Sequence, residues 1–295
     1  MKTSSTIALV SLILLAFAAN SLLCRWALLV FDYSPFTFTL VRLASGAVTL
    51  VMLLGFLPRE TNEKKLGLLP LSSLRFWLLG LSLFIYALMF SLAYVKLDTG
   101  IGAFILFSCV QLTLLMQSRF TGSRFSKQQL IGSVLATSGL ALLLLPGSGG
   151  SDLFYGLLML CAALAWAGFV LLGKGSDKPL VDVSSAFVSA TILMLSLFIV
   201  LVTNTELSLD VAWFSPAFLI AVLSGSVMSG IAYFLWYRVL PIIGIERAAQ
   251  LQLLVPVFAV IMGAQLLGES MSALSWIGCG IIITGVWLFL TDNKT

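Results

Sequence analysis

The sequence predicts an all-α integral membrane protein with ten transmembrane helices, arranged as two inverted five-helix repeats. Composition, long apolar runs and an internal repeat predict this class. Of the 295 residues, 60% are hydrophobic and only 9% are charged, whereas about 25% are charged in an average soluble protein. So few charges cannot cover the surface of a soluble fold of this length. The bilayer is therefore the expected solvent.

The apolar runs indicate helices, because the strands of a membrane barrel would alternate apolar and polar residues. A spanning helix needs about 20 mostly apolar residues. The connections between such runs are too short to form a separate soluble domain. On this basis the spans are expected, in chain order, at residues 7–29, 36–57, 74–94, 100–118, 128–146, 153–173, 183–203, 216–237, 245–267 and 273–291.

Lysine and arginine in the connections predict the orientation. With the N-terminus inside, the inner connections hold 13 of the 16 basic residues, and the outer connections hold only Arg25 and Lys96. Because cytoplasmic loops are enriched in these residues, both termini are expected in the cytoplasm, with the chain in a bacterial inner membrane. Residues 16–18 read Ala-Phe-Ala, so a cleavable signal peptide is the competing interpretation of the first span. Cleavage would leave the other nine spans oriented as before.

The chain repeats weakly after about 146 residues, a spacing at which Gly132 and Gly139 correspond to Gly278 and Gly285. We therefore expect one repeat over residues 1–147 and a second over 148–295. Since five spans is an odd number, the second repeat must enter the membrane from the opposite side. This inverted topology is common among secondary transporters. The alternative is a duplication with no role in transport.

Motifs in the last quarter of the chain carry a family resemblance. They are LLVPVFAV with Pro256, LLGES with Glu269, and a final span with Gly278 and Gly285. This region resembles the C-terminal repeat of EamA-type members of the drug/metabolite transporter superfamily. The resemblance implies a central cavity between inverted repeats and the export or exchange of small metabolites, often amino acids. The sequence departs from the family pattern at Asn20, where many relatives carry a Trp-Gly pair.

Arg42 lies within the second span, where a cation is costly, so it must face protein or water. One interpretation is a handle for an anionic group of the substrate, such as a carboxylate, bound bidentately by the guanidinium. The other is a structural clamp that holds carbonyls or a carboxylate of a neighbouring helix. Both interpretations remain open at this stage.

Other polar residues within spans are candidates for the cavity lining, because buried amides need partners. We expect Gln111 and Gln250 to line the pathway, together with Asn20. Gln252 lies two residues from Gln250, so the two cannot share one face of a continuous helix. Interhelical hydrogen bonding is the alternative role for each amide.

Aromatic residues and one proline complete the candidates within the spans. Tyr86 and Trp166 lie deep enough to contact a substrate. For Tyr94, Trp236 and Tyr237, near span ends, we expect anchoring at the membrane interface instead, as is usual for Trp and Tyr. Pro256 is expected to kink the ninth span, either as a hinge that frees carbonyls for the site or as a simple packing bend.

Glu246 begins the ninth span on the inner side. A carboxylate there is favourable at a helix N-terminus, and capping or pairing with a loop cation is its simplest role. A proton-coupling role is the alternative, which leaves proton-coupled and facilitative transport both open.

Several function classes are disfavoured by what the sequence lacks. It has no histidine, no C-x-x-C pair and no acidic metal cluster, so we expect no metal site, no cofactor and no enzyme activity. It has no phosphate loop of the G-x-x-x-x-G-K type, which argues against ATP-driven transport. The net charge of +4 is too small to indicate nucleic acid.

We therefore predict a secondary transporter, more specifically an exporter, of small organic metabolites such as amino acids, working by alternating access. Efflux of hydrophobic or cationic compounds is the alternative cargo class, and sugar-phosphate exchange ranks third. A non-transporting membrane scaffold is the rival from another class. The predicted partners are a small-molecule substrate and the lipid bilayer, and the sequence leaves the oligomeric state open.

Overall fold

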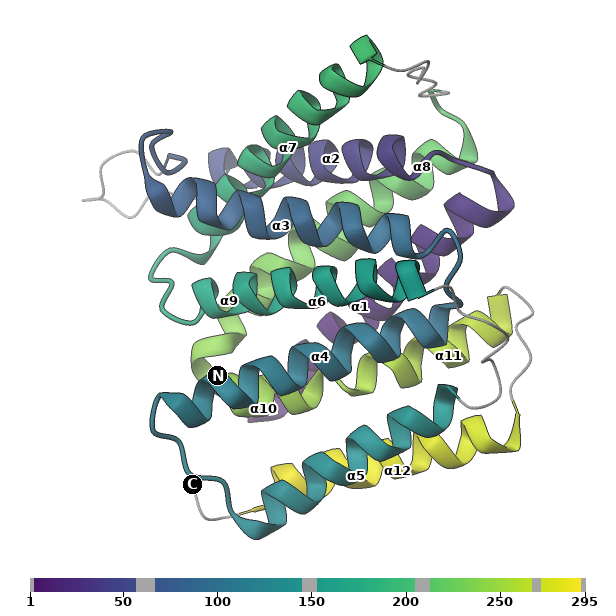
Figure 1. The fold of residues 1–295 in the computed structure, drawn as a ribbon. Helices are drawn as coiled ribbons and strands as arrows, with labels where there is room; N and C mark the ends of the chain where they lie inside the picture. Colours follow the sequence, from purple (N-terminus) through teal and green to yellow (C-terminus); the bar gives the residue numbers. More distant parts are fainter. Residues whose placement is uncertain (1–2, 57–66, 145–152, 205–212, 267–271, 293–295) are drawn as a thin grey trace.

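A computed structural model describes residues 3–56, 67–144, 153–204, 213–266 and 272–292. The described chain forms helices that lie side by side in layers (Figure 1). In chain order they are α1 (Thr3–Val30), α2 (Pro35–Phe56), α3 (Leu74–Ala93), α4 (Thr99–Phe120), α5 (Lys127–Leu144), α6 (Leu153–Gly173), α7 (Pro179–Asn204), α8 (Pro216–Leu223), the π-helical segment η2 (Ser224–Ile231), α9 (Ala232–Ile243), α10 (Ile245–Leu251), α11 (Leu254–Leu266) and α12 (Ala273–Leu290).

The predicted all-α class with ten spans is confirmed. Helices α8, η2 and α9 form one span over Pro216–Ile243, and α10 and α11 form another over Ile245–Leu266. Within the described residues, nine helices are long and apolar enough to cross a membrane. Helix α5 is the tenth predicted span. It has 18 residues, and its first turn, Lys-Gln-Gln at 127–129, lowers its hydropathy.

The packing follows a two-fold pattern. Helix α2 packs on α7, α4 on α11, and α5 on α12, and each pair joins corresponding spans of the two halves. Helix α3 packs on α6, and its counterpart pair, α1 and the η2–α9 span, is also in contact. If each span of the first half is exchanged with its counterpart in the second half, the same pairs of helices remain in contact. Two inverted repeats require this symmetry. The predicted boundary at residues 147 and 148 lies outside the described residues.

Glycines set the distance between α5 and α12. A Cβ atom on Gly132 would lie 2.7 Å from the carbonyl oxygen of Gly285, and one on Gly139 would lie 2.8 Å from that of Gly278. No real Cβ atom approaches a carbonyl so closely, so side chains here would push the helices apart. A shift by the 146-residue repeat converts the Gly132–Gly285 contact into the Gly139–Gly278 contact, and the two helices run antiparallel. The two glycine contacts are therefore equivalent contacts of the two halves.

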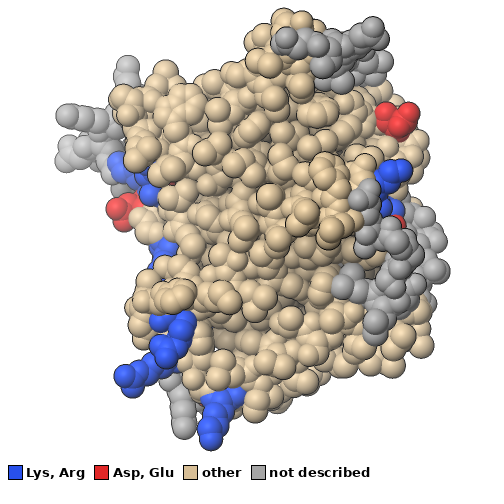
Figure 2. Space-filling model, viewed as in Figure 1, with Lys and Arg blue, Asp and Glu red and all other residues tan. Residues whose placement is uncertain are grey.

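Charged and apolar side chains are distributed over the surface as expected for a protein that spans a bilayer. Figure 2 shows an uncharged belt across the middle, with Lys, Arg, Asp and Glu confined to the two ends of the helices. Large apolar side chains are exposed along this belt, among them Met52, Met116 and Trp287. The expectation of interface anchoring is wrong for Tyr94, Trp236 and Tyr237, because all three are fully buried between helices.

Candidate functional site

A buried polar network centres on Arg42, eight residues into α2. Its Nε donates to Ser229 Oγ at 3.0 Å, and its Nη2 donates to the hydroxyl of Tyr233 at 2.8 Å. The Tyr233 hydroxyl donates in turn to that of Tyr86, at 3.2 Å. Arg42 is only 1% exposed. A residue of the first half thus holds its guanidinium on residues of the η2–α9 span in the second half.

The π-helical segment η2 supplies two hydroxyls to this network. Hydrogen bonds from i to i+5 place residues five apart one turn above another. Ser224 and Ser229 are five apart, and both donate to Asn20 Oδ1, at 2.7 and 3.3 Å. A regular α-helix would turn one of these hydroxyls away. The π segment therefore brings Asn20 of α1 and Arg42 of α2 onto a shared hydroxyl, Ser229.

A glycine allows η2 to lie this close to α2. A Cβ atom on Gly225 would collide with the backbone carbonyl of Arg42 and the hydroxyl of Ser45. The absence of a side chain lets the two backbones touch at the residue that carries the guanidinium. Small residues serve such close approaches between membrane helices. The position of Arg42 relative to η2 is therefore fixed by main-chain packing.

Aromatic rings surround the guanidinium. Its central carbon lies 5.4 Å from the ring centroids of both Tyr86 and Phe90, within cation–π range. The ring of Trp166 lies 4.9 Å from that of Tyr86 and 4.7 Å from that of Tyr233. The rings of Tyr86, Trp166 and Tyr233, together with Asn20, border a cavity of about 10 Å³, which is room for about one water molecule. The site is collapsed in this conformation.

One nitrogen of the Arg42 guanidinium makes no hydrogen bond to the described residues. Arg42 Nη1 is buried and has no hydrogen-bond partner among the described residues. No carboxylate of the described chain pairs with Arg42 either. A buried cation is normally paired, because removing it from water is costly. The network therefore carries an uncompensated positive charge and a spare donor at the interface between the halves.

The predicted site residues fall into two groups. The structure brings Arg42, Asn20, Tyr86 and Trp166 together. It places Gln111 and Gln250 against α5 instead: Gln111 Oε1 accepts from Thr137, and Gln250 Nε2 donates to Ser133 Oγ.

Gln252 is the glutamine at the central site, where its Oε1 accepts from Trp166 Nε1 at 2.8 Å. The sequence analysis did not choose Gln252, Ser224, Ser229 or Tyr233 as lining residues. Their partners lie more than 80 residues away in the chain. The unusual run Gly-Ser-Val-Met-Ser-Gly at 225–230 is the one signal that could have pointed to the serines.

The ninth span breaks near the predicted kink. Helix α10 ends at Leu251 and α11 begins at Leu254. Pro256 has no amide hydrogen to donate to the carbonyl of Gln252, and the amide of Val255 bonds that carbonyl instead, at 3.0 Å. This tighter turn allows Gln250 and Gln252 to face different neighbours. Whether the break works as a hinge stays a prediction.

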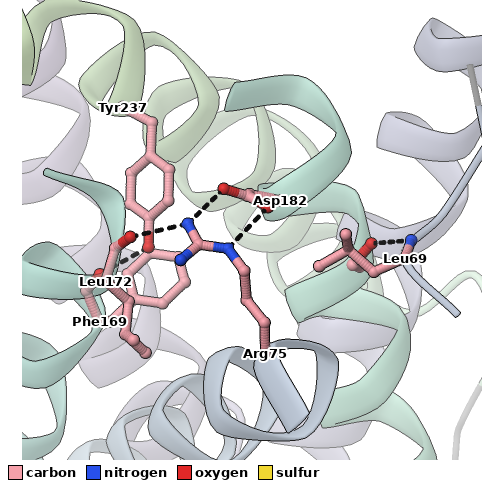
Figure 3. A network of polar contacts seen from close by, with 7 residues as sticks. Leu69, Arg75, Phe169, Leu172, Asp182 and Tyr237 are labelled. Atoms are coloured by element: carbon pink, nitrogen blue, oxygen red, sulfur yellow. Dashed lines mark hydrogen bonds and ion pairs between the residues drawn. The ribbon is translucent and has the colours of Figure 1, made fainter. Parts of the chain in front are cut away.

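Figure 3 shows a second network, at the end of the bundle where α3 and α7 begin. Arg75 holds both carboxylate oxygens of Asp182, at 3.2 and 2.6 Å, and also donates to the carbonyl of Leu172 at 2.9 Å. The hydroxyl of Tyr237 donates to the carbonyl of Phe169 at 2.5 Å. The amide of Leu69 donates to Ser185. Helices α3, α6, α7 and α9 are thereby tied together at this end.

The opposite end has its own ion pair. Arg25, near the end of α1, holds Asp98, at the start of α4, at 2.5 Å and also donates to the carbonyl of Leu97. In the orientation expected from the loop charges, this would be the outer end, and the Arg75–Asp182 pair would lie at the inner end. An ion pair therefore joins helices at each end of the bundle, with Arg42 between them.

Glu246 lies in the first turn of α10, as expected for a helix start. Its Oε1 accepts hydroxyl hydrogen bonds from Ser118, at the end of α4, and from Ser123, in the following turn. The carboxylate thus fastens the α4–α5 turn to the ninth span. It does not join the Arg42 network, so a coupling role for Glu246 stays a prediction.

Known proteins resemble this chain in sequence and in fold. The model of the EamA-like transporter family matches residues 153–291. An uncharacterized protein of Pseudomonas aeruginosa, PA1977, is 40% identical over 272 residues, which cover 92% of this chain and 90% of that protein. YwfM of Bacillus subtilis, described as an uncharacterized transporter, is 30% identical over 159 residues, about half of each chain.

A protein of known crystal structure superposes with a TM-score of 0.76 over 99% of both chains, at 15% identity. At that identity the likeness concerns the fold alone.

Proposed function

Because the chain belongs to the EamA-like transporter family of the drug/metabolite transporter superfamily, we propose that this multi-pass membrane protein carries small organic metabolites, amino acids first among them, out of the cell by alternating access. The proposed binding centre is the network of Arg42, Asn20, Tyr86, Tyr233, Ser229 and Trp166. The proposed orientation places both termini in the cytoplasm.

The uncompensated guanidinium of Arg42 carries this proposal. Arg42 Nη1 is a buried donor that has no partner among the described residues, and it lies where the two halves meet. A carboxylate of the substrate would supply both the missing charge and the missing acceptor. The rings of Tyr86 and Trp166 would then contact the apolar part of the solute. An α-amino acid offers both features in one small molecule.

Efflux of a hydrophobic or cationic compound is the second candidate. The aromatic cluster of Tyr86, Trp166 and Tyr233 favours it, since such rings bind cations and apolar surfaces. The charge of Arg42 opposes a cationic cargo at the same place. A carboxylate-bearing solute is therefore the better match to the whole site.

Counterflow in vesicles tests the proposal directly. Purified protein is reconstituted into liposomes loaded with unlabelled amino acids, and the entry of radiolabelled pools is followed. We expect uptake of at least one carboxylate-bearing pool above protein-free liposomes, and competition by the free acid but not by its methyl ester. Flux of aromatic cations alone would favour the second candidate. A folded protein with no flux for either class would favour the scaffold.

Two further experiments test the direction of transport and its coupling to protons. Cells with and without the protein, compared for metabolites in the medium, report whether export is the physiological direction. A pH gradient across the liposomes accelerates net flux only if transport is proton-coupled. Glu246→Gln should abolish that acceleration, and leave counterflow intact, if Glu246 carries the proton. An unchanged response to the gradient in this variant would exclude Glu246.

Alternating access also requires the Arg75–Asp182 pair to open when the inner end opens. Asp182→Asn removes one charge from a bidentate pair, so we expect the inner end to open more often. Cys24 reports this, because it is buried one turn from Ser21, which borders the central cavity. In a variant whose other three cysteines are replaced, a thiol reagent added from the outer side should modify Cys24 several-fold more slowly once Asp182 is changed, because Cys24 contacts Ser91 near the outer end of α3.

Asp177→Asn is the matched control, because Asp177 is an exposed aspartate in the connection before α7 that adds to the electrostatic field at Arg75 without forming an ion pair with it. It removes the same charge and should leave the rate of Cys24 modification at its original value. Equal rates in the Asp182 and Asp177 variants would argue against the ion pair as a closure.

A further inference from the structure

A wide cleft lies between α4 and α5 on the side of the turn that joins them, whereas farther from the turn Thr137 bonds Gln111 and connects the two helices. Its volume is about 650 Å³, far larger than the cavity at the centre. Apolar side chains form its walls, among them Leu112, Met116, Leu130 and Val134, which are 48–66% exposed. These residues belong to predicted spans, so the cleft opens toward lipid.

The packing of the outer helices explains why this space is open. Helix α5 is held against α12 by the glycine contacts, and α4 packs on α6 and α11. In Figure 1 the α5–α12 pair forms a separate layer beside α4 and α11. The side chains of α4 and α5 therefore do not fill the gap between the two layers.

Two arginines stand at one end of the cleft. Arg119 lies in the last turn of α4 and Arg124 lies in the connection to α5, and both border the cleft. The chain reverses between them in a tight turn, in which Gly122 has a φ of +100° and the amide of Ser123 bonds the carbonyl of Ser118. Glu246 fastens this turn through two serine hydroxyls. The two arginines are thus held at one mouth of an apolar cleft.

The charge at this mouth is unmatched. Within the described part of the chain, neither Arg119 nor Arg124 forms an ion pair, and no carboxylate borders the cleft. The Glu246 carboxylate, the acidic group fastened to the turn, accepts from the serines instead. Guanidinium groups bind phosphate through paired, charge-assisted hydrogen bonds. Two cations at the mouth of an apolar cleft that opens toward lipid suit a molecule that has a negatively charged group and an apolar chain.

We propose that this cleft binds one anionic phospholipid of the bilayer, with its headgroup phosphate on Arg119 and Arg124 and an acyl chain between α4 and α5. The lipid fills the gap between the α5–α12 layer and the rest of the bundle. The site is separate from the Arg42 network and does not depend on the solute that the protein carries.

Native mass spectrometry of the purified full-length protein tests this proposal. The protein is mixed in detergent with equal amounts of phosphatidylglycerol and phosphatidylcholine, which differ in net headgroup charge. Since the choline cation neutralises the phosphate charge that the two arginines would bind, we expect phosphatidylglycerol to be retained about tenfold over phosphatidylcholine. The double variant Arg119→Gln, Arg124→Gln should retain the two lipids about equally.

Arg238→Gln is the matched control for net charge, because Arg238 is exposed, lies on the proposed inner side and does not border the cleft. It should keep the preference. Val134→Trp leaves every charge in place but fills the cleft, and should lower phosphatidylglycerol retention. Glycerol phosphate, which has the headgroup charge without chains, should not compete at equal concentration.

Three outcomes would overturn the proposal. They are no preference in the original protein, an unchanged preference in the double arginine variant, and effective competition by glycerol phosphate. The last would show a site for a free organic phosphate. Thermal melting of each variant confirms that a lost preference does not come from unfolding.

Discussion

Arg42→Gln is expected to lower counterflow of carboxylate-bearing solutes by about 30-fold or more. Loss of one partner of a buried charge-assisted contact costs about 2–5 kcal/mol, and 1.4 kcal/mol corresponds to a factor of ten. The fold should survive, because the variant loses two hydrogen bonds but no longer buries an uncompensated charge. The measurement is the initial rate of counterflow at equal protein in the liposomes, with melting temperature followed in parallel.

Arg42→Lys separates a ligand from a structural clamp. Lysine keeps the charge and loses the planar fork, so a substrate handle should retain part of the flux, with weaker apparent affinity. A clamp would show itself as a lower melting temperature in both variants, with flux falling only in proportion to folded protein. Arg238→Gln, at an exposed position, should change neither measurement. Full flux in folded Arg42→Gln would remove this residue from the binding site.

Gly285→Leu is expected to destabilise the protein by about 3 kcal/mol or more, because overpacking at a closed contact costs about 1–3 kcal/mol and occasionally more. A Cβ atom at this position would lie 2.6 Å from the carbonyl of Gly132 and would collide with the backbone amide of Ala136. Backbone atoms cannot relieve such a contact by a change of rotamer, so α5 and α12 must separate. The melting temperature in detergent should fall by about 6–12 °C.

Gly280→Leu supplies the matched comparison. Gly280 lies on the same helix, α12, and a Cβ atom there meets no other atom within 4 Å. Leucine is also a better helix former than glycine, so this variant should melt at the same temperature as the original protein or higher. If the two variants melted alike, close packing of α5 on α12 would not be a main source of stability.

The spans and the fold class could be predicted because they depend on local physical constraints. Long apolar runs must satisfy their backbone groups internally in lipid, which leaves helices as the spanning element. The expected 36–57, for instance, became Pro35–Phe56. The spacing that relates Gly132 to Gly278 also proved informative, since both glycines lie at the α5–α12 contact. Both predictions needed only composition and spacing along the chain.

The partners of the site residues could not be predicted in the same way. In a soluble helix the apolar stripe shows which face points inward. In lipid both faces are apolar, because no hydrophobic driving force separates the bundle from its surroundings. The sequence analysis therefore had no basis for preferring Gln252 and chose Gln250, and it assigned Tyr237 to the interface although the residue is buried.

The sequence by itself determined that Arg42 must lie inside the bundle, because a guanidinium in a span cannot face lipid. Only the tertiary structure decided that its partners are Ser229 and Tyr233, some 190 residues away. That choice depends on the π segment and on the close approach at Gly225, which arise when two halves of the chain pack together. Local energetics decide which residues enter the membrane interior, whereas contacts between distant helices decide what those residues can bind.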